Sequence, residues 1–197
     1  MDNLYLVLAV VIAYLLGNIS PSTILAKMAG KDIKKEGSGN AGTTNALRVL
    51  GKKAALITLV IDIGKGVVAV LLGGVIAGPE TAMICAPAVF IGHVWPVLLK
   101  FKGGKGVATA FGTLLAVNWQ LALICLGIVI VVVVLTRMVS LGSVTAAVCF
   151  VVLAHFMEPG FFWPGLVMAV ILIFKHRANI GRIIRGEENR ISFKKQT

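Results

Sequence analysis

The stretch that decides the fold is VATAFGTLLAVNWQLALICLGIVIVVVVLT, residues 107–136. As a single helix it would be about 45 Å long, whereas the hydrocarbon core of a bilayer is about 30 Å thick. It is therefore too long for one membrane span and too short for two ordinary ones. The polar sequence Asn118-Trp119-Gln120 interrupts it, and we expect the chain to double back there.

The chain as a whole has the composition of a membrane protein. Over 197 residues it is 58% hydrophobic, with a mean hydropathy of +0.95, which exceeds what a soluble domain of this length can bury. The net charge of +11 is typical of a membrane chain that retains Lys and Arg in its cytosolic loops, so the charge alone does not identify a partner. We expect no nucleic-acid partner. Asp2 takes the place of a basic signal-peptide start, and the first apolar stretch is interpreted as a retained span.

The hydropathy pattern and the basic residues together predict an all-α polytopic membrane protein with seven transmembrane helices. If residues 107–136 double back, every loop that contains a Lys or Arg falls on one side of the membrane, and Asp2, Glu80 and Glu158 fall on the other. The positive-inside tendency then puts the N-terminus outside and the C-terminus in the cytosol. We expect a single domain, 1–197, with these spans: Leu4–Met28, Ala54–Ala77, Thr81–Leu99, Val107–Val117, Leu121–Thr136, Leu141–Met157 and Phe161–Phe174.

The first basic loop has the composition of a phosphate-binding loop. Its glycines allow backbone amides to turn toward an anion, its hydroxyl and amide side chains add donors, and an arginine can bind phosphate bidentately. The alternative is a flexible loop that uses glycine only for turns. The spacing also satisfies GxGxxG, but no strand precedes it, so the dinucleotide fingerprint does not apply. The candidate binding residues are Ser38, Gly39, Asn40, Gly42, Thr44, Asn45 and Arg48.

The second basic loop, FKGGKG at residues 101–106, precedes a helix predicted to begin at Val107. Amides at a helix N-terminus, together with a lysine, form an anion site, so Gly103, Gly104 and Lys105 are candidates. It is not a Walker A loop, because Gly106 stands where that motif has Ser or Thr. A positive-inside anchor on a tight turn explains the loop equally well.

Further polar residues follow the last span and lie within the membrane. His176 and Asn179 share a face at helical spacing, with Glu188 beyond them, and Ser140 and Ser143 follow Arg137. The alternatives are a solvated tail that binds lipid headgroups and serines that bond back to their own helix. Intramembrane charges are costly, so the i, i+3 pair Asp62 and Lys65 is assigned a supporting role, as is a buried, hydrogen-bonded His93. No residues are assigned to a metal. The three cysteines lie in apolar runs and are expected to be free thiols.

Three ordered blocks resemble a known family. They are GSGNAGTTNALRVLG at 37–51, GHVWPVLLKFKGGKGVAT at 92–109 and HRANIGRIIRGEE at 176–188. This combination is similar to the bacterial membrane acyl-phosphate:glycerol-3-phosphate acyltransferases, the PlsY family, and the similarity extends over nearly the whole chain. The family's DxxKG motif is present as Asp62, Lys65 and Gly66. The resemblance implies a seven-helix fold with a cytosolic active site in the bacterial inner membrane.

The resemblance implies that an acyl group passes from acyl phosphate to glycerol 3-phosphate, giving lysophosphatidic acid, without a cofactor. His176, Glu188 and Lys105 are the catalytic candidates, and Ser143, His176 and Asn179 join the binding residues. Contact with the enzyme that produces acyl phosphate is a further expectation. The His and Asp separated by four residues in CoA-dependent acyltransferases are absent from the sequence. The rival functions are an organic-phosphate transporter, which would have repeated halves and a midplane site, and a scaffold for lipid synthesis.

Overall fold

The structure, a computed structural model, describes residues 3–191. These residues form ten α-helices and two 3-10 turns, in agreement with the predicted all-α class. The chain divides into two compact units, one up to Asn118 and the other from Trp119 onward. The prediction of one domain over 1–197 stays a prediction, and the two units are described separately below.

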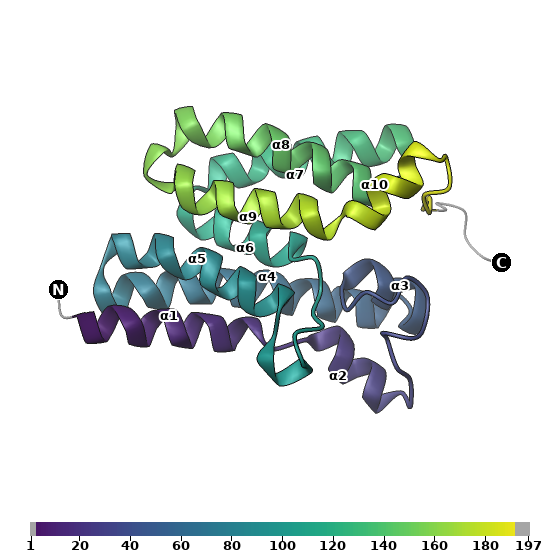
Figure 1. The fold of residues 1–197 in the computed structure, drawn as a ribbon, viewed down its shortest axis with the longest axis horizontal. Coiled ribbons are helices and arrows are strands. Elements are labelled where there is room, and N and C mark those ends of the chain that lie inside the picture. The colour runs from purple at the N-terminus through teal and green to yellow at the C-terminus, as the bar shows by residue number, and fades with distance from the viewer. Residues whose placement is uncertain (1–2, 192–197) are drawn as a thin grey trace. The chain divides into compact units, whose positions relative to one another are not determined.

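In the first unit, α1 (Asn3–Gly17), α4 (Lys52–Ala77) and α5 (Pro79–Val94) lie side by side, and α6 (Val107–Val117) packs on α4 (Figure 1). Small residues allow the helices to approach closely, as is common for helices in a bilayer. A Cβ atom at Gly17 would collide with the carbonyl of Val89, and one at Gly92 with the carbonyl of Tyr14. The contact between α1 and α5 therefore depends on two glycines that face each other.

The first predicted span is broken. Residues 3–28 are long and apolar enough to cross a membrane, but α1 ends at Gly17 and α2 (Pro21–Met28) begins after a short non-helical segment. Pro21 explains the restart, because proline has no N–H to donate and favours the first turn of a helix. The break leaves backbone carbonyls inside the unit, which need hydrogen-bond donors.

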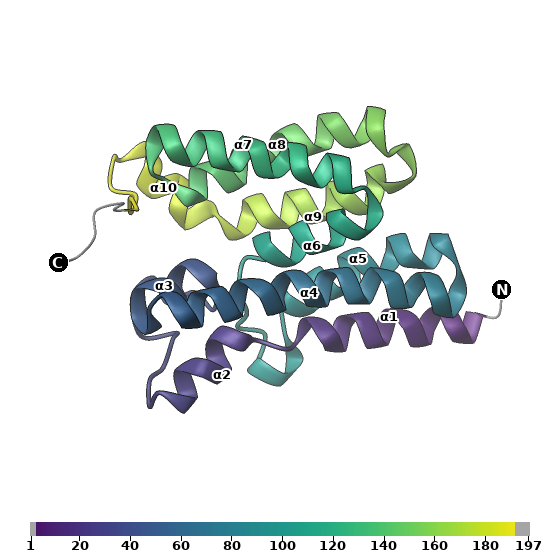
Figure 2. The same cartoon turned by 180° about the vertical axis from the view of Figure 1, so that it is seen from behind.

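The helix α3 (Thr43–Leu50) lies with α2 near the beginning of α4 (Figure 2). The sequence interpretation treated Thr44, Asn45 and Arg48 as part of the first loop, whereas the structure places all three on α3. A small core of Ala26, Ile33 and Ala41 holds the preceding loop in place. This end of the unit contains both basic loops of the sequence analysis.

The second unit contains α7 (Trp119–Thr136), α8 (Val139–Met157), α9 (Phe162–Lys175) and α10 (Arg177–Ile184). The helix α8 packs against both α7 and α9. Between α9 and α10 the chain bends by 54° at His176. The bend separates the apolar α9 from the short polar α10, which contains Asn179 and Arg182.

The outer surfaces of the long helices are apolar, as lipid contact requires. Val75 on α4, Leu135 on α7 and Phe156 on α8 are each more than three-quarters exposed, at 85%, 78% and 77%. Within residues 3–191, five helical segments are long and apolar enough to span a membrane, or six if the bent α9–α10 pair counts as one span. The helix α6 ends at Val117, and Asn118 has extended backbone angles, so residues 107–136 are not one helix. The count of seven and the orientation remain predictions.

Candidate functional site

Asn45 organises the first candidate phosphate-binding loop. Its side chain is buried, and its amide donates hydrogen bonds to the carbonyls of Ile33 and Glu36, each at 3.0 Å. Its Oδ1 atom accepts the Ser38 backbone N–H at 2.8 Å. A Cβ atom at Gly37 would collide with this same oxygen. Asn45 therefore shapes the loop from within, and glycine is required where the loop crosses it.

Three backbone amides of the loop already have acceptors inside it. The N–H of Ser38 bonds to Asn45, that of Gly39 to the Glu36 carbonyl at 3.0 Å and that of Gly42 to the Asn40 carbonyl at 3.0 Å. These three amides therefore have acceptors within the loop, and anion binding by the loop stays a prediction. The glycines give the loop its shape, with Gly37 and Gly39 in the left-handed region (φ 59° and 68°).

The donors that remain for an anion lie on and beside α3. Gly42 is the N-cap of this helix, and the first-turn N–H groups of Thr43 and Thr44 have no acceptor within the helix. Arg48 is exposed one turn further along α3, and the hydroxyl-bearing Ser38 is exposed in the loop. A helix N-terminus with a nearby guanidinium and hydroxyls can bind a phosphate group.

The second basic loop packs directly on the first. A Cβ atom at Gly104 would collide with the His93 imidazole and would lie 2.7 Å from the Ala41 carbonyl. The Gly104 N–H donates to the His93 carbonyl at 3.1 Å. The close approach to the His93 imidazole and the Ala41 carbonyl requires glycine at position 104, because no side chain fits there. Lys105, the next residue, is half-buried, and α6 begins at Val107 as predicted.

Behind this loop lies a buried charged cluster made of Asp62, Lys65 and His93. The Lys65 ammonium is 2.7 Å from the Asp62 Oδ1 atom and 2.8 Å from the His93 Nδ1 atom. The predicted i, i+3 ion pair is therefore present, and the predicted hydrogen-bonded His93 is buried. The His93 Nδ1 atom also lies 3.4 Å from the Asp62 Oδ1 atom, and its Nε2 atom faces Gly104.

Lys65 also donates hydrogen bonds to the carbonyls exposed at the break between α1 and α2. Its ammonium donates to the Gly17 carbonyl at 3.2 Å and to the Ile19 carbonyl at 2.7 Å. A break inside a membrane requires such donors, because lipid offers none. The sequence interpretation missed this role, and it also missed Asn18, whose Oδ1 atom accepts the Leu98 N–H at 3.2 Å. Pro21 was the sequence signal for the break.

In the second unit, Glu188 connects α10 to α8. Its Oε1 atom accepts hydrogen bonds from the Ser140 hydroxyl at 2.8 Å and the Asn179 amide at 2.6 Å. Its Oε2 atom accepts from Arg182 at 2.8 Å. Gly186, with φ 74°, turns the chain back so that Glu188 reaches these donors. The structure thus joins Asn179 and Glu188, two predicted site residues, to Ser140.

These three donors determine the ionisation of Glu188. Burial raises the pKa of its carboxyl group, but the hydrogen bonds from Asn179, Ser140 and Arg182 outweigh burial and hold the pKa below its ordinary value. An ionised carboxylate whose oxygens already accept three hydrogen bonds is poorly suited to accept a proton from a substrate. Its hydrogen bonds instead connect α8 to α10.

His176 has a geometry better suited to proton transfer. It is buried at the bend between α9 and α10, and its Nδ1 atom lies 2.8 Å from the Leu172 carbonyl. A carbonyl only accepts, so Nδ1 has the proton, and Nε2 has the lone pair of the neutral ring. Ser143 instead donates to the Val139 carbonyl of its own helix at 2.9 Å. This is the back-bonded alternative noted for the serines.

The fold thus describes an α-helical polytopic membrane protein with two basic loops packed together at one end of its first unit. Comparison with known proteins identifies its family. Residues 7–186 match the family described as glycerol-3-phosphate acyltransferase, and the chain belongs to this family. It is an integral membrane acyltransferase and an enzyme of lipid synthesis.

Relatives and solved structures agree over nearly the full length. A glycerol-3-phosphate acyltransferase of Thermoanaerobacter pseudethanolicus is 48% identical over 97% of this chain and 98% of its own. One of Clostridioides difficile is 47% identical, over 98% of each chain. A crystal structure of PlsY, an integral membrane glycerol 3-phosphate acyltransferase in its glycerol 3-phosphate form, is similar with a TM-score of 0.91. It is 34% identical and covers 95% of this chain and 96% of that one. The lysophosphatidic acid form of PlsY gives a TM-score of 0.88, again at 34% identity and over 95% of each chain.

Proposed function

We propose that this enzyme transfers a fatty acyl group from an acyl phosphate to the 1-hydroxyl of glycerol 3-phosphate. The products are lysophosphatidic acid and inorganic phosphate. The observation that carries the proposal is the direct packing of two basic loops, at Gly104 against Ala41, within a chain of the glycerol-3-phosphate acyltransferase family. Two phosphates must be held during this reaction, one on each substrate.

The first loop and α3 offer donors for one phosphate. Arg48 supplies a bidentate guanidinium, while Ser38 and Thr44 supply hydroxyls beside the N-terminus of α3. Lys105 supplies a second cation on the neighbouring loop. Because all of these lie in the first unit, their arrangement follows from contacts within that unit. Gly39, Asn40 and Gly42 shape the loop, and Asn45 holds it together.

The chemical step requires little covalent help from the protein. The 1-hydroxyl oxygen forms an ester bond with the acyl carbon, and the bond from that carbon to the donor's phosphate oxygen breaks. The hydroxyl proton passes to the departing phosphate, so a protein general base is optional. An acyl phosphate is already activated by its leaving group, so positioning and charge neutralisation provide most of the acceleration.

The roles of the remaining candidates follow from their contacts. His176 is the protein's candidate for general base, because Leu172 fixes its tautomer. Glu188 positions α10, and with it Asn179, instead of accepting the proton. Lys105 neutralises developing charge on the donor phosphate. Asp62, Lys65 and His93 support the loop that contains Lys105 from behind.

We also propose that the enzyme crosses the bacterial inner membrane seven times, with its N-terminus outside and its active site facing the cytosol. The basic residues support this orientation, since doubling back at Asn118 puts every loop that contains a Lys or Arg on the same side. An acyl phosphate would then arrive from the cytosolic enzyme that makes it, with which contact at this face is expected.

Two experiments test the proposal. Single cysteines at Asn118 and Pro159, in a chain whose native cysteines are replaced, should react with an impermeant thiol reagent on intact cells. Reaction at Asn118 only after permeabilisation contradicts the orientation. Proteoliposomes with glycerol 3-phosphate and palmitoyl phosphate should form lysophosphatidic acid and phosphate in equal amounts. Uptake of glycerol 3-phosphate without product would instead identify a transporter.

A further inference from the structure

A basic pocket lies in the first unit apart from the residues assigned to the reaction. Its volume is about 330 Å³, and α2, the loop that follows it and the turn after α5 form its walls. The residues that line it are Thr23, Lys27, Lys31, Asp32, Ile33, Lys34 and Leu99. None of them is among the binding or catalytic residues proposed above.

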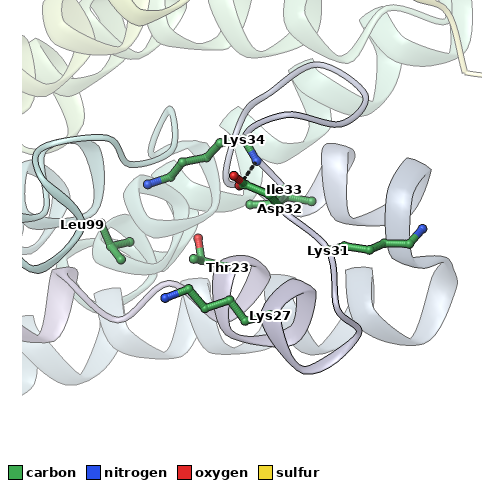
Figure 3. Close-up of a pocket in the computed structure, with 7 residues that line it drawn as sticks. All are labelled: Thr23, Lys27, Lys31, Asp32, Ile33, Lys34 and Leu99. Atoms are coloured by element: carbon green, nitrogen blue, oxygen red, sulfur yellow. Dashed lines mark hydrogen bonds between the residues drawn. The ribbon is translucent and has the colours of Figure 1, made fainter.

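The side chains of Lys27 and Lys34 point in the same direction, toward the side of the pocket formed by Leu99 (Figure 3). They come from different elements, since Lys27 is in the last turn of α2 and Lys34 is in the loop. Lys31 points away from both in the same view and is engaged elsewhere. Its ammonium donates to the Val49 carbonyl at 3.1 Å and lies 3.6 Å from the Glu36 carboxylate.

The pocket has an excess of positive charge. Burial lowers the pKa of Lys34, Asp32 opposes this effect, and repulsion from Lys102 and Lys27 adds to it. Lys27 and Lys102 therefore each lie close enough to repel the Lys34 ammonium, and Asp32 is the carboxylate that attracts it. The Asp32 Oδ1 atom accepts the Lys34 backbone N–H at 3.0 Å, which holds the carboxylate at the base of the loop. A phosphate group entering the pocket would relieve this repulsion.

Apolar surface flanks the pocket. Met28, directly after Lys27 in the pocket wall, is 80% exposed, and Leu98, directly before Leu99, is 73% exposed. Lys27 also lies at the end of the apolar segment Asn3–Met28, which is long enough to span a membrane. Lysines at such positions extend to the level of the lipid headgroups, while neighbouring apolar side chains contact the acyl chains.

We propose that this pocket binds a phosphate group, with Lys27 and Lys34 as its ligands and the Thr23 hydroxyl beside them. The exposed Met28 and Leu98 favour the headgroup of an anionic phospholipid as its source, and a soluble phosphate ester is the other source with the same chemistry. Its proposed ligands differ from Arg48 and Lys105, the cations assigned to the reacting phosphates.

Lipid binding to purified protein tests the proposal. Native mass spectrometry in neutral detergent should detect bound phosphatidic acid in preference to phosphatidylcholine. The double variant Lys27→Gln/Lys34→Gln should bind it at least tenfold more weakly, since hydrogen bonds to charged groups are individually worth about that factor. The matched controls are Lys53→Gln, an exposed lysine on α4 outside the pocket, and Arg48→Ala, which removes the other phosphate site. Both controls should retain the preference.

A second variant is expected to raise the affinity for phosphatidic acid. Loss of folding would lower the affinity and therefore cannot imitate this result. Asp32→Asn keeps the side-chain oxygen that accepts the Lys34 N–H but removes the negative charge, and it should tighten phosphatidic acid binding. Inorganic phosphate and glycerol 3-phosphate are tested as competitors. If millimolar phosphate displaces the lipid and binds with the same dependence on Lys27 and Lys34, the soluble source is correct. Equal lipid binding by the wild type, the double variant and Asp32→Asn overturns the proposal.

Discussion

Lys65→Met should be among the most destabilising single substitutions in the first unit. The ammonium of Lys65 pairs with Asp62 at 2.7 Å and satisfies the carbonyls of Gly17 and Ile19 at 3.2 and 2.7 Å. Methionine has a similar volume and is apolar, so the loss of stability measures the contribution of the charge and its hydrogen bonds. Removing one partner of a buried ion pair costs about 3–5 kcal/mol, because the other charge remains buried and unpaired.

The second substitution separates charge from hydrogen bonding. In Asp62→Asn/Lys65→Met the unpaired carboxylate is gone, while the carbonyls at the break between α1 and α2 lack their donor and His93 Nδ1 loses its contact with the ammonium. Each unsatisfied group costs about 1–3 kcal/mol. The double variant should therefore recover a substantial part of the stability lost in Lys65→Met, while staying below the wild type.

Thermal unfolding in detergent micelles, followed by fluorescence, measures both effects. A change of 1 kcal/mol shifts the Tm of a chain of this size by roughly 2–4 °C, so Lys65→Met should unfold about 6–20 °C below the wild type. Lys53→Met, at an exposed position on the same helix, is the control and should shift it little. The reasoning is refuted if Lys65→Met unfolds within 2 °C of the wild type, or if the double variant is less stable than the single one.

The remaining predictions concern the loops and the second unit. Arg48→Ala and Lys105→Ala should each reduce turnover by roughly tenfold to a few hundredfold without loss of folding, since each removes a cation from a substrate phosphate; near-normal turnover in both would exclude the proposed site. Gly104→Ala should lower activity because its methyl group displaces the second basic loop, whereas Gly64→Ala, where a Cβ atom meets nothing within 4 Å, should not; equal activities would show that the close approach is unimportant. The pKa of Glu188 is below its ordinary value of 4.5 in the folded protein, so its stabilising effect is complete above about that pH and is lost as the pH falls through the lowered pKa. The stability advantage of the wild type over Glu188→Gln should therefore decrease on acidification in thermal melts. An advantage that grows at low pH would contradict a stabilising role of ionised Glu188 between α8 and α10.

Local sequence patterns predicted the features that depend on near neighbours. The spacing of Asp62 and Lys65 placed them one helical turn apart, and their ion pair is present at 2.7 Å. The polar interruption after Val117 predicted the end of α6, where the structure also leaves the helix. The class of fold and the apolar helices followed from hydropathy alone. Every helix face that contacts lipid must be apolar, so the pattern is visible in the sequence.

Other features depend on contacts between distant residues, which a local pattern does not contain. Lys65 reaches the carbonyl of Ile19, which is 46 residues away, and Ser140 reaches Glu188 across 48 residues. Glu188 was therefore predicted as a catalytic candidate from its type, whereas its three hydrogen bonds indicate a positioning role. For the same reason Asn45 was predicted as a substrate ligand, although its side chain is used by the loop.

The number of membrane crossings illustrates a different limit, since it depends on a helix shorter than the bilayer is thick. The helix α6 has 11 residues, about 16 Å at the usual rise, against roughly 30 Å of hydrocarbon. Length and hydropathy do not decide whether such a segment crosses. The charge pattern does favour a crossing, and thiol labelling at Asn118 is the measurement that decides it.

The central claim is that this enzyme uses a donor with a phosphate at the reacting carbon. Purified protein is supplied with glycerol 3-phosphate and either palmitoyl phosphate or palmitoyl-CoA at equal concentration, and lysophosphatidic acid is measured over time. We expect rapid product formation with palmitoyl phosphate and none above background with palmitoyl-CoA, because a CoA thioester has no phosphate at the acyl carbon to contact Lys105 or to accept the hydroxyl proton. Equal rates with the two donors would contradict the account.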